Sequence, residues 1–212
     1  MNDTNPSLTI HTAVALFTIR ERLEFLCLDQ GRLPMAVLEA GEGLEASARR
    51  ALGVATGIED VFLEQLYTFD GGRDGPQATV AYYALAPCEQ LPISRPGVGW
   101  ADPADAATRL HNDHRIIVQR ACERLAGKLE YAPIAYQFLA ERFTLGELQA
   151  VYEIIGRQAL DKRNFRRRIQ ASAHLVETHD VRRNGCHRPA RLYRLRDTQP
   201  MIARSPVRPY NE

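Results

Sequence analysis

The spacing of apolar and polar residues predicts a chain that begins with strands and ends with helices. Residues 8–18 are apolar and β-branched, and Leu23, Phe25 and Cys27 face one way while Glu24 faces the other. These two segments follow each other closely, so we expect them to pair as a β-hairpin. Further strands are predicted over residues 61–69, 78–86 and 97–101.

Two helices are predicted among these strands. The alanine-rich residues 46–56 precede Gly57, which suits the left-handed position just after a helix. Residues 113–127 form an amphipathic pattern, whose predicted buried face consists of Ile116, Ile117, Ala121 and Leu125. Strands with interspersed helices predict an α+β sandwich for this part of the chain.

The pattern changes after a connecting segment at residues 131–139. Thr144 and Glu147 have the spacing of a capping box, which opens a predicted helix over residues 145–155. A short break leads to a second predicted helix over residues 161–172, and two short apolar and arginine-rich strands follow at residues 175–182 and 190–195. Helix, turn, helix and hairpin in this order are typical of a winged helix-turn-helix.

Charge is distributed unevenly along the chain, although the net charge is only +1. Residues 1–156 carry 13 Lys and Arg against 21 Asp and Glu, whereas residues 157–212 carry 14 against 5. A basic module on an acidic body indicates an anionic partner, and nucleic acid is the commonest one for an arginine-rich globular segment.

Composition excludes several other classes of protein. No apolar run reaches the roughly 18 residues of a membrane span, and residues 1–7 lack a secretory signal pattern. The four cysteines are scattered, which favours reduced thiols and a cytoplasmic location. His174, His179, Cys186 and His187 match no standard zinc spacing, so we expect no metal there.

The second helix of the basic module carries a set of predicted DNA contacts. Phe165 and Ile169 define its buried face, and Arg167 lies on the opposite side, with Arg163, Asn164 and Gln170 within about 60° of Arg167. Such side chains can read base edges, and flanking arginines suit phosphates. The alternative is a solvated basic face without a partner. The predicted DNA-binding residues are Lys162, Arg163, Asn164, Arg166, Arg167, Arg168 and Gln170 on the helix, and Arg182, Arg183, Arg188 and Arg191 on the hairpin.

Residues 33–58 resemble the Nudix box in their spacing. Glu42 and Arg50 fall on the glutamate and arginine that tie the loop of this motif to its helix, and Leu52, Gly57 and Ile58 also match. The three helical glutamates of the motif are replaced by Ala51, Val54 and Ala55, and its opening glycines by Met35 and Ala36.

These replacements remove the metal-binding side chains of the motif. In the Nudix family, glutamates on one helix face hold Mg²⁺ or Mn²⁺, which neutralises a diphosphate and activates water. Without them we expect no metal, no cofactor, no catalytic residues and no enzyme activity. Rescue by Glu39, Glu42 or Glu45 is an alternative that their place in the loop and first turn of the helix disfavours.

The whole pattern, over residues 8–196, resembles the Nudix-related transcriptional regulators of the NrtR family. The specific motifs are FTLGELQ, NFRR and RPARLY, together with the weaker match of His111, Asn112, Asp113 and His114 to the start of the last Nudix helix. The resemblance implies a homodimeric repressor, commonly of NAD-biosynthesis genes, that binds a double-stranded DNA operator and is released by ADP-ribose or a related nucleotide. Other members answer to sugar metabolites.

The resemblance also implies a domain division and an effector site. We expect a degenerate Nudix-like effector and dimerisation domain over residues 1–130, a connector over 131–140, a winged helix-turn-helix over 141–197 and an extended tail over 198–212. The predicted fold is therefore α+β, a Nudix-like α/β/α sandwich with a winged helix-turn-helix. The predicted effector-binding residues are Arg49, Arg50, Tyr67, Phe69, Tyr83 and His114.

Two other functions stay open at this point. The glycine-poor loop at Met35 and Ala36 leaves room for a different effector or for a DNA-binding module without a ligand, since glycines let the backbone approach a diphosphate. A Nudix hydrolase of a nucleoside diphosphate derivative is the alternative from the enzyme class. Turnover of ADP-ribose that depends on Mg²⁺ would distinguish it from the regulator.

Overall fold

The computed structural model describes residues 8–58, 60–70, 77–91, 95–129, 133–172, 174–182 and 189–196. The sequence also predicts turns at residues 70–72 and 184–185, and all of these residues except Asp70 lie outside the described part of the chain. Within the described part of the chain, no helix is both long and apolar enough to cross a membrane.

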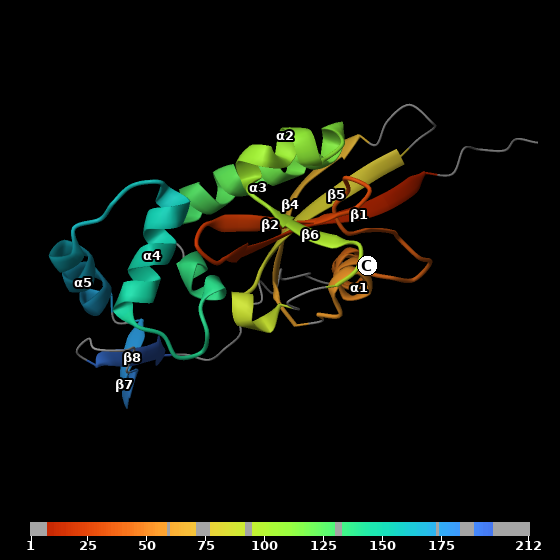
Figure 1. Cartoon of the computed structure of the whole chain (residues 1–212). Helices are drawn as coiled ribbons and strands as arrows, with labels where there is room; N and C mark the ends of the chain where they lie inside the picture. Colours follow the sequence, from red (N-terminus) through yellow and green to blue (C-terminus); the bar gives the residue numbers. More distant parts are fainter. Residues whose placement is uncertain are drawn as a thin grey trace, which may run out of the picture.

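A mixed six-stranded sheet forms the centre of the N-terminal part (Figure 1). Its strands are β1 (Thr9–Ile19), β2 (Leu23–Leu28), β3 (Met35–Val37), β4 (Phe62–Asp70), β5 (Gln77–Leu85) and β6 (Val98–Ala101). The strand order is β4-β5-β1-β2-β6, and β3 pairs with β1. β1 pairs with β5 in parallel, whereas its pairings with β2 and β3 are antiparallel. Burial on both faces explains why β1 is almost continuously apolar.

Helices cover both faces of this sheet. α1 (Leu44–Thr56) packs on one face, where Ala48 and Leu52 join a core with Val14 and Leu16 of β1. α3 (Asn112–Lys128) lies on the other face (Figure 1). The connections contain 3-10 helices η1 (Cys88–Gln90) and η2 (Pro103–Asp105) and the short helix α2 (Ala106–Arg109). The result is the α/β/α sandwich that the sequence predicts.

The C-terminal part is a winged helix-turn-helix. It contains η3 (Pro133–Phe138), α4 (Leu145–Gly156), α5 (Lys162–Ala171), β7 (Leu175–Arg182) and β8 (Ala190–Leu195). The capping box is present: the Thr144 hydroxyl accepts from the Glu147 amide at 3.1 Å, and the Glu147 carboxylate accepts from the Thr144 amide at 2.7 Å. Strands β7 and β8 pair antiparallel as the hairpin of the wing.

A single apolar core joins the two parts. Ile117, Val118 and Leu125 of α3 belong to the same buried cluster as Leu148 and Val151 of α4. The winged helix is therefore packed against the last helix of the sandwich, which places the two parts in direct contact.

Two sequence-based expectations differ from the structure. Ile116 is 41% exposed instead of buried, because Val118 takes its place beside Ile117 in the core. The strand β3 was not predicted, since its three residues are too few to give a period-two pattern. Gly57 does adopt the left-handed conformation expected after α1, with φ 78°.

Candidate DNA-binding surface and effector site

Helix α5 is positioned by its cap and by two buried side chains. The Asp161 carboxylate accepts a hydrogen bond from the Asn164 amide at 2.8 Å, which satisfies a free donor in the first turn. Phe165 and Ile169 are buried in the core, and the Phe165 ring meets Tyr152 of α4 edge-on at 5.4 Å. Because these inward residues are four apart, the remaining positions of α5 face outward.

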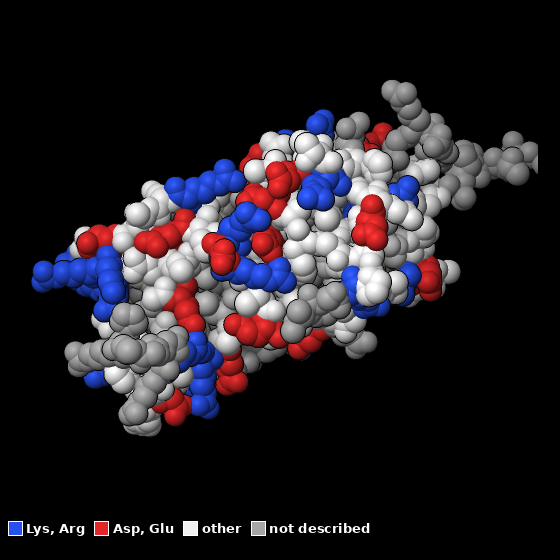
Figure 2. Space-filling view, viewed as in Figure 1, with Lys and Arg blue, Asp and Glu red and all other residues white. Residues whose placement is uncertain are grey.

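The outward face of α5 is strongly basic. Lys162, Arg163, Asn164, Arg166, Arg167, Arg168 and Gln170 are all exposed, and Figure 2 shows Lys and Arg atoms gathered at the end of the molecule that α5 forms. Arg167 donates to the Asn164 side-chain oxygen at 3.0 Å, so these two residues share one patch. Arg168 instead stacks against the rings of Tyr152 and Phe165, at 5.7 and 5.8 Å.

The hairpin arginines differ from those of α5. Arg182 is paired with Glu147 and Arg191 with Glu177. Arg183 and Arg188, also predicted to bind DNA, lie outside the described residues. The sequence-based prediction missed the acidic partners because the pairs join residues 35 and 14 positions apart.

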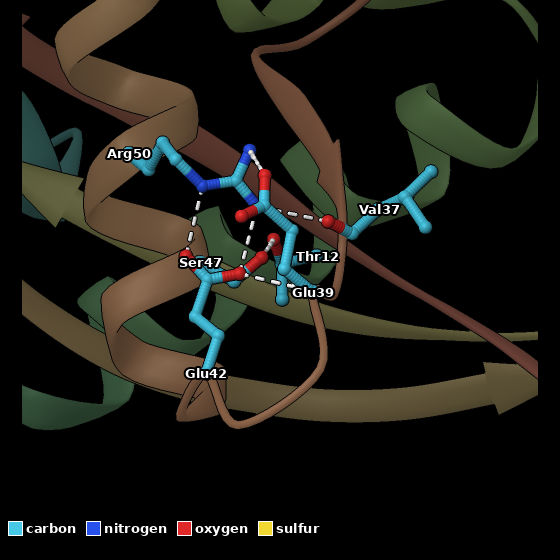
Figure 3. Close-up of polar contacts among 6 residues, drawn as sticks. All are labelled: Thr12, Val37, Glu39, Glu42, Ser47 and Arg50. Atoms are coloured by element: carbon cyan, nitrogen blue, oxygen red, sulfur yellow. Dashed lines mark hydrogen bonds and ion pairs between the residues drawn. The ribbon is translucent and has the colours of Figure 1, made fainter.

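The loop before α1 is held by an ion-pair network (Figure 3). Arg50 donates to both carboxylate oxygens of Glu42, at 2.8 and 2.7 Å, and to the Val37 carbonyl at 2.9 Å. Glu39 is a third partner of Arg50, at 3.3 Å. The pKa of Glu42 is lowered to about 2, and the hydrogen bond from Arg50 is the largest cause. Arg50, predicted to bind the effector, therefore ties the loop to the helix.

Side chains at the base of the loop continue this network. A hydrogen bond from the Ser47 hydroxyl contributes to this lowered pKa of Glu42. The same hydroxyl is 2.9 Å from the Thr12 hydroxyl in the buried interface of α1 with β1. Arg49, the neighbouring effector candidate, pairs with Glu45 at 2.9 Å and donates to the Val61 carbonyl at 3.2 Å.

The residues of α1 do not fit the divalent cation of Nudix enzymes. Ala51, Val54 and Ala55 have no oxygen ligands in their side chains, and Val54 is 74% exposed where a carboxylate would project. Glu39, Glu42 and Glu45, the alternative ligands, are all engaged with Arg49 or Arg50. Among the described residues, no group of three or more acidic, His or Cys side chains is arranged to hold a metal.

The opposite face of the sheet carries the aromatic effector candidates. Strand register places Tyr67, Ala81, Ala13 and Met35 in one row across β4, β5, β1 and β3, so these side chains project from the same face. The row has small side chains in the middle and larger ones at both ends. The next row is formed by Phe69, Thr79, His11 and Val37.

This end of the sheet face is incompletely covered. Val37 is 52% exposed, and the Tyr67 and Phe69 rings lie 5.4 Å apart and half-buried. Asp113 and Arg120 of α3 both influence the pKa of Tyr67, which burial raises. The exposed Ile116 lies on α3 between these two residues. Partly exposed apolar side chains therefore lie on β3, on β4 and in the first turns of α3.

His114 and Tyr83 lie at different depths on this face. The His114 Nδ1 atom accepts a hydrogen bond from the Leu33 amide at 2.8 Å, so its Nε2 atom carries the proton of the neutral ring. Burial lowers the pKa of His114, which favours that neutral form. Tyr83 is 0% exposed in the core, so a ligand on the sheet surface cannot touch it unless other side chains move.

The architecture defines the class of protein, a Nudix-type sandwich joined to a winged helix. Residues 135–195 match the family model of the NrtR DNA-binding winged helix domain. The chain is 32% identical to the ADPR responsive transcriptional repressor NtrR of Acinetobacter baylyi over 209 residues, which is 90% of this chain and 83% of that protein. The chain belongs to the NrtR family of transcriptional regulators.

Solved structures of the family match the fold. The NrtR of Shewanella oneidensis in complex with a 27mer DNA matches with a TM-score of 0.80 and 30% identity, covering 88% of this chain and 93% of that one. The NUDIX domain of the same protein in complex with ADP ribose matches with a TM-score of 0.50 and 26% identity, over 59% of this chain and 93% of that one. The resemblance to this family that the sequence motifs indicate is thereby confirmed.

Proposed function

We propose that this chain is a transcriptional repressor that binds operator DNA through α5 and releases it when ADP-ribose binds the N-terminal sandwich. The observation that carries the DNA-binding role is the basic outward face of α5, whose cations have no carboxylate partner among the described residues. Membership of the NrtR family, and the DNA complex of the Shewanella oneidensis relative, support the same role.

The effector proposal rests on the uncovered end of the sheet face. Tyr67 and Phe69 are half-buried and offer ring surfaces suited to stacking with a purine. His114 supplies a neutral donor at the edge of this face. A relative that responds to ADPR, and the ADP ribose complex of another, support ADP-ribose as the ligand.

We further propose that the sandwich does not hydrolyse its ligand and that two chains form the DNA-binding unit. Ala51, Val54 and Ala55 of α1 supply no carboxylate to hold the cation that would activate water. The division into a sensor over residues 1–130, a connector over 131–140 and a DNA-binding part over 141–197 belongs to this proposal. That the regulated genes serve NAD metabolism stays a prediction from the family resemblance.

Two measurements test this function. The protein is used to select duplexes from a random DNA pool, and we expect a palindromic site whose binding weakens steeply with salt, because neutralised phosphates release counterions. In a thermal-shift panel of nucleotides and sugar phosphates, ADP-ribose is expected to raise the melting temperature. Selection of no duplex would refute the DNA-binding role. Mg²⁺-dependent turnover of ADP-ribose or NADH would refute the non-enzymatic one.

A further inference from the structure

Two groups of cations in the described part of the winged helix differ in their partners. The five on α5, Lys162, Arg163, Arg166, Arg167 and Arg168, make no ion pair with any described residue. By contrast, Arg142, Arg182 and Arg191 each pair with a carboxylate of the same domain. Among the described residues, α5 therefore carries a cluster of unpaired cations, and the paired arginines need another explanation.

Arg182 is joined to the start of α4 through Glu147. One carboxylate oxygen of Glu147 accepts from the Thr144 amide at 2.7 Å in the capping box, and the other accepts from Arg182. The Arg182 guanidinium also donates to the Arg142 carbonyl at 3.1 Å. One guanidinium thus bridges a side chain and a backbone group of the segment that opens α4.

The same segment holds the hairpin at two further points. Arg142 pairs with Asp180 of β7, and Phe143 exchanges two backbone hydrogen bonds with Tyr193 of β8, at 3.0 and 2.7 Å. Arg182 is the last residue of β7. Its contact with Glu147 is therefore a third tie between the hairpin and the segment that opens α4.

We propose that Arg182 is a positioning residue, which clamps the wing to α4 through Glu147, and is not a phosphate contact. The proposal rests on the DNA-binding function proposed above. Glu147 cannot follow Arg182 toward DNA, because its other oxygen caps α4. If Arg182 moved to a phosphate, it would leave a carboxylate unpaired beside the polyanion, and like charges repel.

Two substitutions on opposite sides of the clamp distinguish these roles. Glu147→Gln keeps an oxygen that can cap α4 but loses the charge that attracts Arg182, and Arg182→Met loses the other partner. The probe is a fluorescein-labelled duplex that the wild-type full-length chain selects from a random pool, and the readout is anisotropy. We expect each variant to weaken binding by the same factor, about twofold to fivefold, and the double variant to be no weaker than either.

The dependence of affinity on salt gives a second readout. For a positioning residue, the slope of log K against log[salt] stays at the wild-type value in Arg182→Met. Loss of a phosphate contact lowers the slope by about 0.9 per contact, and Glu147→Gln would then tighten binding by removing a negative charge. A lowered slope together with tighter binding by Glu147→Gln would overturn the proposal.

Controls keep the outcomes separate. Glu177→Gln breaks the Arg191 pair within the hairpin but leaves the clamp intact, so it is expected not to weaken binding. Arg166→Met is the positive control, because it is expected to lower the salt slope by the amount that loss of one phosphate contact causes. If Arg182→Met lowers the melting temperature of the protein, Arg182→Lys is used in its place. One ammonium cannot reproduce the guanidinium fork that bridges Glu147 and Arg142. Wild-type affinity in Arg182→Lys would therefore contradict the clamp. Selection of no duplex by the wild type refutes the function instead.

Discussion

Replacing Arg167 by alanine is expected to change what the protein reads on DNA. Arg167 lies opposite the buried Phe165 and Ile169, and its side chain is held 3.0 Å from the Asn164 oxygen at the centre of the exposed face. Arg166 lies about 80° from the buried side, toward the flank of the helix. If α5 enters the major groove, Arg167 reaches base edges and Arg166 reaches a phosphate.

The expected loss of DNA affinity differs between Arg167 and Arg166. Loss of a base contact costs about 1–3 kcal/mol, so Arg167→Ala should weaken operator binding roughly 5- to 150-fold and lower the preference over random DNA by the same factor. Arg166→Ala should weaken both DNAs equally. Between 50 and 200 mM salt, its affinity should fall about 3.5-fold less than that of the wild type, from a slope change of about 0.9.

The assay is anisotropy on two labelled duplexes of equal length and composition, the selected operator and a scrambled sequence, at several salt concentrations. Both residues are exposed, so melting temperatures should stay near the wild-type value. An equal loss on operator and scrambled DNA for Arg167→Ala would refute the base-reading role and with it the proposed orientation of α5.

Three further predictions concern the scaffold. Leu148→Ala creates a cavity where α3 and α4 meet, so urea unfolding should show a free energy of unfolding that is lower by about 2–5 kcal/mol. A decrease below about 1 kcal/mol would mean that the core between the two parts is loosely packed. Gly31 has φ 65°, and a Cβ there would lie 2.9 Å from the Arg109 carbonyl oxygen, so Gly31→Ala should lower the melting temperature, and an unchanged value would contradict the close approach. Because the pKa of Glu42 is lowered from 4.5 to about 2, its ionised form stabilises the fold fully above pH 4.5 and loses this effect as pH falls toward 2. The melting difference between wild type and Glu42→Gln should shrink over that range, and a difference independent of pH would argue against the Arg50 pair.

Local patterns predicted most of the elements correctly. The capping box of Thr144 and Glu147, the stop at Gly57 and the inward pair Phe165 and Ile169 depend on neighbours within one or two helical turns. All the residues that produce such a pattern lie within a short stretch of sequence. The outward face of α5 could be derived from the same window.

Contacts between distant segments could not be derived in this way. The partner of Arg182 is 35 residues away, so a charge count assigns that arginine to DNA when the structure pairs it with Glu147. Likewise, the parallel pairing of β1 with β5 brings Ala13 beside Ala81 and defines the face on which Tyr67 lies. The sequence predicts Ile116 in the core, whereas the structure exposes it. Periodicity identifies the apolar side of a helix, but it does not show how much of that side other elements cover.

ADP-ribose binding to the sandwich is proposed to release DNA from α5, and one titration tests this coupling. ADP-ribose is added to the complex of the wild-type chain with its selected operator while anisotropy is recorded, and calorimetry measures ADP-ribose binding with and without DNA. We expect the DNA to be released, and DNA to weaken ADP-ribose binding by the same factor, because coupling between two binding sites is reciprocal. A complex that stays intact at ADP-ribose concentrations saturating the free protein would contradict the claim.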